Sequence, residues 1–146
     1  MKQLTIIYSR LPPTSNKIYF RGTILTSAAR KYAEDFSLEV VRKYLPEISE
    51  INRKGVFSLH LKFFFETLIN ESYFSNKKNK AKTLYKRTDL TNRVKLLEDC
   101  VRDALAIDDC QTFHASLEKH HAPGNERVEI TITEIDPSYF NVPVWP

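Results

Sequence analysis

A ten-residue alternating segment in the middle of the chain constrains the fold more than any other feature. Within residues 56–65, large apolar side chains stand at every second position, and Ser58, His60 and Lys62 lie between them. Successive side chains of a β-strand point to opposite faces, so this pattern predicts a strand that buries one face of a sheet. The side chains expected on the buried face are Phe57, Leu59, Leu61, Phe63 and Phe65.

Two segments with helical spacing lie on either side of that strand. In the first, Ser27 is expected to cap the N-terminus and Pro46 to end the helix. The second covers residues 91–105, and Thr91 is a plausible cap. Apolar residues recur every three or four positions, which is the period of a helix that buries one face. They are Tyr32, Phe36, Val40 and Tyr44 in the first helix and Val94, Leu97, Val101 and Leu105 in the second.

Three further strands complete the predicted fold. Residues 4–8 form the first, and residues 113–117 and 128–132 alternate on either side of a Pro-Gly-Asn turn at 123–125. This turn composition leads us to expect that the last two strands form an antiparallel hairpin. With a short extended piece at 23–25, the order is strand, helix, strand, helix, hairpin. It predicts a single α+β domain over residues 1–146, two-layered, with a mixed β-sheet on which two helices pack.

The composition agrees with one globular domain and sets limits on its partners. The chain has 146 residues, 42% of them hydrophobic, and its net charge of +4 is compatible with a polyanionic partner. Cys100 and Cys110 have neither the number nor the spacing of a zinc site or a disulfide framework, and both are expected to be packing residues. No apolar stretch has the length of a signal peptide or a membrane span, which favours a cytoplasmic protein without a membrane partner.

Acidic residues stand at both ends of the second predicted helix. Asp89 comes just before it, and Asp108 and Asp109 follow it at the start of the next strand. We expect carboxylates from the two places to converge beside Lys95 as a site for Mg²⁺, which prefers oxygen ligands. A simpler interpretation is that Asp89 interacts with the helix dipole, Lys95 pairs with Asp99 at i,i+4, and the later aspartates form a solvated turn.

A basic segment lies between the central strand and the second helix. Six of the twelve residues in 76–87 are lysine or arginine: Lys77, Lys78, Lys80, Lys82, Lys86 and Arg87. Next to an acidic metal site they are interpreted as an arm that contacts DNA phosphates, and the alternative is a solvated loop. The flanking Tyr73, Phe74 and Tyr85 are expected to pack in the core, although stacking on unpaired bases is open to them.

Several motifs follow one another along nearly the whole chain. The central one is Lys-Arg-Thr-Asp-Leu-Thr-Asn-Arg-Val-Lys at residues 86–95, followed by Glu-Asp at 98–99 and Ile-Asp-Asp-Cys-Gln at 107–111. Weaker motifs are a Pro-Pro-Thr-Ser-Asn loop within 11–19, a Thr-Ser-Ala helix entry within 26–32 and a closing strand at 127–134. In this order, they resemble the signature of the RusA-like Holliday junction resolvases.

The resemblance implies structure-selective cleavage of four-way junction DNA by a homodimer that uses Mg²⁺ or Mn²⁺. The family's first essential aspartate falls on Asp89, its lysine on Lys95 and its late aspartate on Asp109. Its second aspartate falls on Thr91, as in related phage-type members, which leaves one metal ligand unassigned. Glu98 and Asp99 are the candidates nearest in sequence for that ligand. Expected DNA contacts are Asn16, Asn92 and the six basic residues, Lys77, Lys78, Lys80, Lys82, Lys86 and Arg87.

Two other functions compete with a junction-resolving nuclease. A DNA-binding protein that has lost cleavage through Thr91 would keep the basic segment and the junction contacts. A basic RNA- or ribosome-associated domain would leave the grouping of Asp89, Lys95 and Asp109 unexplained. Trp145, in the C-terminal tail, is a candidate for docking on a partner subunit.

Overall fold

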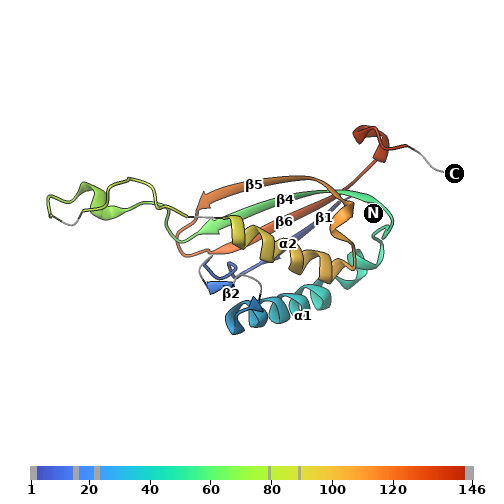
Figure 1. The fold of residues 1–146 in the computed structure, drawn as a ribbon, viewed down its shortest axis with the longest axis horizontal. Helices are drawn as coiled ribbons and strands as arrows, with labels where there is room; N and C mark the ends of the chain where they lie inside the picture. Colours follow the sequence, from blue (N-terminus) through green and yellow to red (C-terminus); the bar gives the residue numbers. More distant parts are fainter. Residues whose placement is uncertain (1–2, 15–16, 22–23, 79, 89, 144–146) are drawn as a thin grey trace.

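The structure, a computed structural model, describes residues 3–14, 17–21, 24–78, 80–88 and 90–143 (Figure 1). The predicted site residues Asn16 and Asp89 lie outside this range, as does Trp145. Asn92 is described as part of a helix, but its side chain is not. Among the described residues, no helix is long and apolar enough to cross a membrane.

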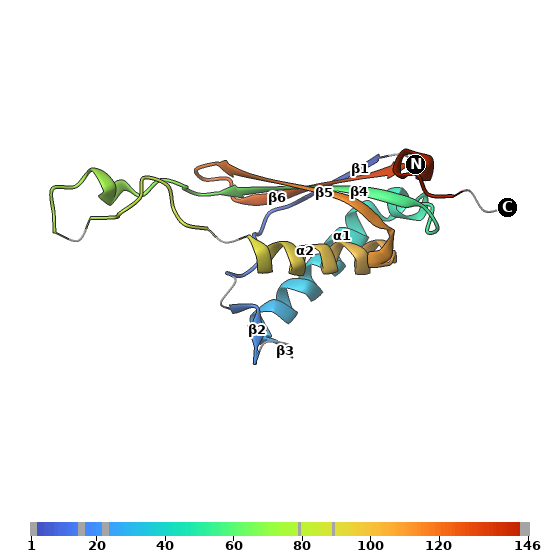
Figure 2. The same cartoon turned by 45° about the horizontal axis from the view of Figure 1, so that its top comes forward.

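A four-stranded mixed sheet forms one layer of the molecule. Its strands are β1 (Gln3–Tyr8), β4 (Val56–Phe65), β5 (Thr112–His121) and β6 (Arg127–Ile135), in the spatial order β1-β6-β4-β5. β4 and β5 are parallel, whereas β6 pairs antiparallel with both β1 and β4. The helices α1 (Ser27–Ser49) and α2 (Thr91–Leu105) lie together on one side of the sheet, as Figure 2 shows. The two-layer α+β prediction is therefore confirmed.

Smaller elements complete the chain. A two-stranded ribbon of β2 (Tyr19–Phe20) and β3 (Ile24–Leu25) precedes α1. The 3₁₀ turns η2 (Glu71–Phe74), η3 (Asp109–Gln111) and η4 (Pro137–Phe140) lie after β4, before β5 and after β6, respectively.

The core forms between the helices and the sheet face that the alternating segment predicted. All five apolar side chains of β4 expected on that face are buried, whereas Ser58, His60 and Lys62 are partly exposed. The five buried side chains of β4 pack in one cluster with Leu97, Val101 and Leu105 of α2 and with Tyr32 and Phe36 of α1. Burying large side chains from both layers is the main force that holds the helices on the sheet.

The predicted hairpin between the last two strands is wrong, because β4 lies between them. The connection from β5 to β6 instead crosses the end of β4: the backbone N–H of Ala122 donates to the carbonyl of Phe65 at 2.7 Å. Glu66, which follows β4, accepts a 2.7 Å hydrogen bond from the N–H of Gly124. The turn residues were correctly located, but the turn joins strands that are two positions apart in the sheet.

The first helix begins and ends differently from the prediction. Its cap is Thr26, whose side chain accepts from the N–H of Ala29, and Ser27 is the first helical residue. Pro46 does not end the helix, which continues to Ser49 after a kink at Tyr44 (φ −116°, ψ 17°). The kink places Pro46 in the first turn of a second helical segment, where its missing N–H leaves no hydrogen bond unmade.

The second helix has the predicted bounds but not the predicted cap. Leu90 is its N-cap residue without a side-chain hydrogen bond, and Thr91 is already helical.

The two cysteines lie in different environments. Cys100 is buried, as expected of a packing residue, and burial raises the pKa of its thiol to about 12. Cys110 is exposed, so its assignment to packing was wrong.

Residues 66–78 and 80–88, here called the arm, leave the end of β4 and project far from the sheet before α2 begins (Figure 1). Backbone hydrogen bonds join its two sides, from Asn70 N–H to Leu84 and from Lys86 N–H to Leu68, both at 2.8 Å. The expectation that its aromatic residues pack in the core is wrong. Tyr73, Phe74 and Tyr85 remain 39%, 72% and 68% exposed.

Candidate functional site

An acidic group lies just beyond the C-terminal end of α2. Ligand atoms of Asp108, Asp109 and Cys110 come within 4.8 Å of one another, and all three residues are exposed. Hydrogen bonding with the Asp109 side chain, and then with the backbone N–H of Cys110, lowers the pKa of Asp108. Two carboxyl groups so close together repel each other when both are ionised, unless a cation offsets their charge.

The end of α2 is built to turn the chain sharply towards these residues. Ala106 adopts the left-handed conformation (φ 52°), which ends the helix, and the N–H of Ile107 reaches back to the carbonyl of Arg102 at 3.1 Å. Arg53, in the loop before β4, donates from its guanidinium to the carbonyl of Leu105 at 2.8 Å. This hydrogen bond connects the loop before β4 to the C-terminal end of α2.

Gln111 fixes the acidic group in place, a role that the sequence did not reveal. Its side-chain amide donates to the carbonyls of Arg53 at 2.8 Å and Gly55 at 2.9 Å. Its oxygen accepts from the N–H of Asp108 at 2.8 Å, and Asp108 in turn caps η3. This is a capping box, for which the sequence signal is an acidic cap followed three residues later by glutamine.

The other candidate residues are spread along α2 rather than gathered at this end. The helix has 15 residues and is therefore roughly 21 Å long, with Thr91 at its first position and Asp109 beyond its last. Lys95, one turn in, is exposed and holds its ammonium 5.3 Å from the centre of the Tyr19 ring. Leu90 and Asp109 thus lie at opposite ends of α2. The expected convergence with Asp89 lies outside the described residues and stays a prediction.

Two carboxylates lie in the middle of α2. Glu98 is half-buried, and burial raises the pKa of its carboxyl group despite the charge of Arg102. Asp99 forms a hydrogen-bonded ion pair with Arg102, three residues further on, instead of the i,i+4 pair with Lys95 considered from the sequence. A bound metal would therefore have to compete with Arg102 for Asp99.

Comparison with known families identifies the family to which the chain belongs. The family model described as endodeoxyribonuclease RusA matches residues 11–133, from the loop after β1 into β6. The chain belongs to the RusA endodeoxyribonuclease family. The RusA match includes the arm, α2 and the acidic group, so the resemblance found in the motifs is confirmed. No curated protein matches the chain significantly.

RusA membership implies endonuclease activity on Holliday junction DNA, and RusA-type nucleases generally depend on a divalent metal ion. In this RusA chain, the late acidic motif coincides with the exposed pair Asp108 and Asp109. The basic motif leads out of the arm into α2. Both ends of α2 thus carry residues that the family motif singles out.

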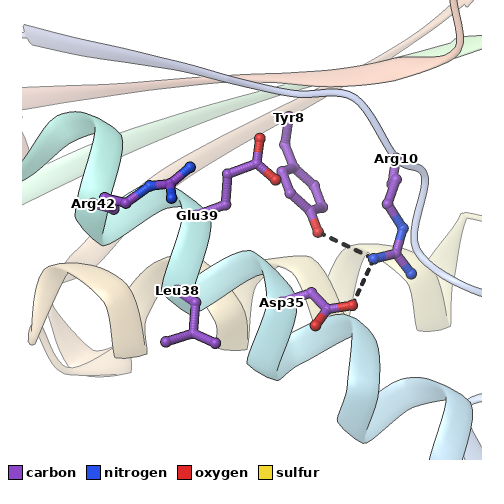
Figure 3. A pocket seen from close by; sticks show the side chains of 6 residues that line it. All are labelled: Tyr8, Arg10, Asp35, Leu38, Glu39 and Arg42. Atoms are coloured by element: carbon purple, nitrogen blue, oxygen red, sulfur yellow. Dashed lines mark hydrogen bonds and ion pairs between the residues drawn. The ribbon is translucent and has the colours of Figure 1, made fainter.

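This RusA chain also has a hollow of about 660 Å³ between the end of β1 and α1 (Figure 3). Arg10 lies between Tyr8 and Asp35, with its guanidinium 2.8 Å from the Asp35 carboxylate, and this contact lowers the pKa of Asp35. Arg42 and Glu39 line the other side. Because two cations and two carboxylates balance here, the hollow has no excess charge that would attract DNA phosphate.

Proposed function

We propose that the chain is a metal-dependent endodeoxyribonuclease that cuts four-way junctions by phosphodiester hydrolysis, with Asp89, Lys95 and Asp109 at its centre. The observation that carries this proposal is the exposed carboxylate pair Asp108 and Asp109. It stands where the family motif has its late aspartate, on a turn that Gln111 holds rigid. Membership of the RusA family supports the reaction type.

The donor set at this pair fits Mg²⁺ or Mn²⁺. Carboxylate oxygens are the ligands that these ions prefer, and a divalent cation would offset the repulsion between Asp108 and Asp109. Asp108 already accepts a hydrogen bond from the N–H of Cys110, so Asp109 is the better ligand. When bound, the ion would supply an activated water and neutralise charge on the attacked phosphate. Lys95 would hold a phosphate oxygen or stabilise that same charge.

Lys95 and the turn that carries Asp109 are separated along α2 of one chain, and a homodimer would bring the two groups together. Lys95 lies ten residues before the end of α2, roughly 15 Å along the axis from the turn that carries Asp109. A two-fold dimer with antiparallel α2 helices would set Asp109 of one chain against the partner subunit's Lys95, and the reverse. It would also present two equivalent sites for two symmetric cuts.

The function is tested with labelled four-way junctions and a linear duplex of the same sequence. We expect Mg²⁺ or Mn²⁺ to support cleavage of the junction but not of the duplex, and EDTA to stop it. If neither ion supports cutting while the junction is still bound, a DNA-binding protein is the better description. That second candidate is favoured by one observation: position 91, on the first turn of α2, carries a threonine hydroxyl instead of a carboxylate.

The shared site is tested by mixing two inactive variants, Lys95→Ala and Asp109→Asn. In a mixed dimer, a site shared between chains loses both groups on one side and neither on the other, so one intact site remains. About half of the dimers are mixed after random exchange. We therefore expect mixing to restore nicking of one strand.

If each site belonged to a single chain, both sites of every mixed dimer would stay defective and mixing would restore nothing. A monomeric mass at micromolar concentration, unchanged by junction DNA, would also contradict the homodimer. The control is to mix each variant with itself, which should restore nothing in either case.

A further inference from the structure

The positive charge of the protein is concentrated in the arm. The arm contains six lysines and arginines but only two acidic residues, Glu66 and Glu71, a net charge of +4. The whole chain also has a net charge of +4, so all other residues together have a net charge of zero. All six cationic side chains are exposed. The attraction to a polyanion therefore acts on the arm rather than on the body.

The same arm presents aromatic rings to solvent. Phe74, on η2, is 72% exposed and contacts Tyr73 edge-to-face, with 5.4 Å between the ring centres. Single exposed apolar residues are common on protein surfaces and by themselves indicate nothing. Phe74 differs because it lies on η2, three residues before the first of the arm's six cations, Lys77, and on a segment that stands away from the body (Figure 1).

The arm holds η2 in a defined position. The Asn70 side chain donates to the carbonyls of Thr83 at 2.9 Å and Tyr85 at 3.3 Å, on the opposite side of the arm. The hydroxyl of Ser72 accepts from the N–H of Ala81 at 3.2 Å. These bonds join η2 and the residue before it to residues 81–85 on the opposite side of the arm. A backbone segment held in this way loses little conformational freedom on binding, which favours the use of its side chains as contacts.

We propose that the arm reads the branch point of the DNA, with Phe74 stacking on bases that are unpaired or poorly stacked where the four strands cross. This inference rests on the proposed action on junction DNA. Inserting a ring into intact duplex requires a base step to be unstacked, which is unfavourable. Where stacking is already interrupted, that cost is largely absent. Phe74 would thus favour branched DNA, while the neighbouring lysines hold phosphates of any DNA.

The test compares Phe74→Ala and Phe74→Trp with Leu38→Ala, which removes an apolar side chain of similar exposure (74%) from α1. Each protein is titrated, with Ca²⁺ in place of Mg²⁺, against a four-way junction carrying 2-aminopurine at the branch point and against a linear duplex. We expect Phe74→Ala to weaken junction binding roughly tenfold and to leave duplex binding and the salt dependence unchanged. The 2-aminopurine response to the wild-type protein should disappear in Phe74→Ala and persist in Phe74→Trp and Leu38→Ala.

Two results would overturn the inference: an unchanged 2-aminopurine response in Phe74→Ala, or equal losses of affinity for junction and duplex. These readouts do not require cleavage, so the two proposals can fail separately. A protein that stacks on the branch point without cutting would contradict the nuclease alone. A protein that cuts junctions with no effect of Phe74→Ala would contradict the stacking role alone.

Discussion

Replacing Asp109 by asparagine is expected to abolish junction cleavage, with a fall of at least about 100-fold in rate, while junction binding is kept. The change removes one negative charge from an exposed carboxylate pair but alters little in shape. Losing that charge removes a ligand of the proposed metal ion and also reduces repulsion of the DNA phosphates. Cleavage at saturating DNA and affinity measured with Ca²⁺ separate the two effects.

Asp103→Asn is the matched control, because Asp103 is an exposed carboxylate on the last turn of α2 and outside the acidic group. It should cut at the wild-type rate. If Asp109→Asn also cuts at that rate, Asp109 has been wrongly assigned. If it loses junction binding together with cleavage, the separation of binding from chemistry is wrong.

Replacing Lys77, Lys78, Lys80 and Lys82 together by alanine is expected to weaken binding to junction and duplex alike. Each phosphate contact contributes about 0.9 to the slope of log affinity against log salt, so four lost contacts should flatten the slope by about 3 to 4. At physiological salt this corresponds to a fall of about 100-fold or more. The rate of cleavage at saturating DNA should survive, because no proposed metal ligand is changed.

The matched control removes four exposed lysines from the body: Lys31, Lys43, Lys54 and Lys119. It has the same net charge as the arm variant, so any difference between them reports position rather than total charge. An equal slope in the arm variant and the wild-type protein would show that the arm lysines are only solvated. A loss confined to junctions would contradict phosphate contacts, which carry no information about branching or sequence.

Long periodic patterns predicted their elements well, because burial on one face determines both the period and the ends. The strand at residues 56–65 and the helix at 91–105 have the predicted bounds. The pairing of strands was harder to predict. Turn residues indicate where the chain reverses, but not whether another strand lies between the two strands that the turn joins. Two strands joined by the turn at 123–125 were expected to pair, whereas the buried β4 separates them.

Hydrophobicity misled the prediction on the arm, which projects from the two-layered body (Figure 1). Phe74 and Tyr85 were expected in the core, but they are 72% and 68% exposed. Pro46 was expected to end α1, yet a kink two residues earlier accommodates it. Both errors come from predicting burial or a helix end from residue type alone, although each also depends on the surrounding structure.

For the candidate site, the sequence indicated the residue types that matter but not how they are arranged in space. Residue types and motif order singled out Asp108 and Asp109, which are neighbours in the sequence and lie on one exposed turn. Their convergence with Asp89 beside Lys95 stays a prediction. Gln111 was noted only as a motif letter, because its role depends on carbonyls of Arg53 and Gly55, more than fifty residues away in sequence. The length of α2, which separates Lys95 from Asp109, could have been read from the predicted helix.

The position of the arm in the β4–α2–β5 connection bears on how such a protein can change over evolutionary time. Parallel strands need a long crossover in any case, and this one already contains α2. Lengthening a connection costs little, since the entropy of closing a loop grows only with the logarithm of its length. Insertions between the end of β4 and the start of α2 would therefore leave the sheet and the acidic turn intact. Relatives could exchange one substrate-sensing module for another at this point without rebuilding the scaffold.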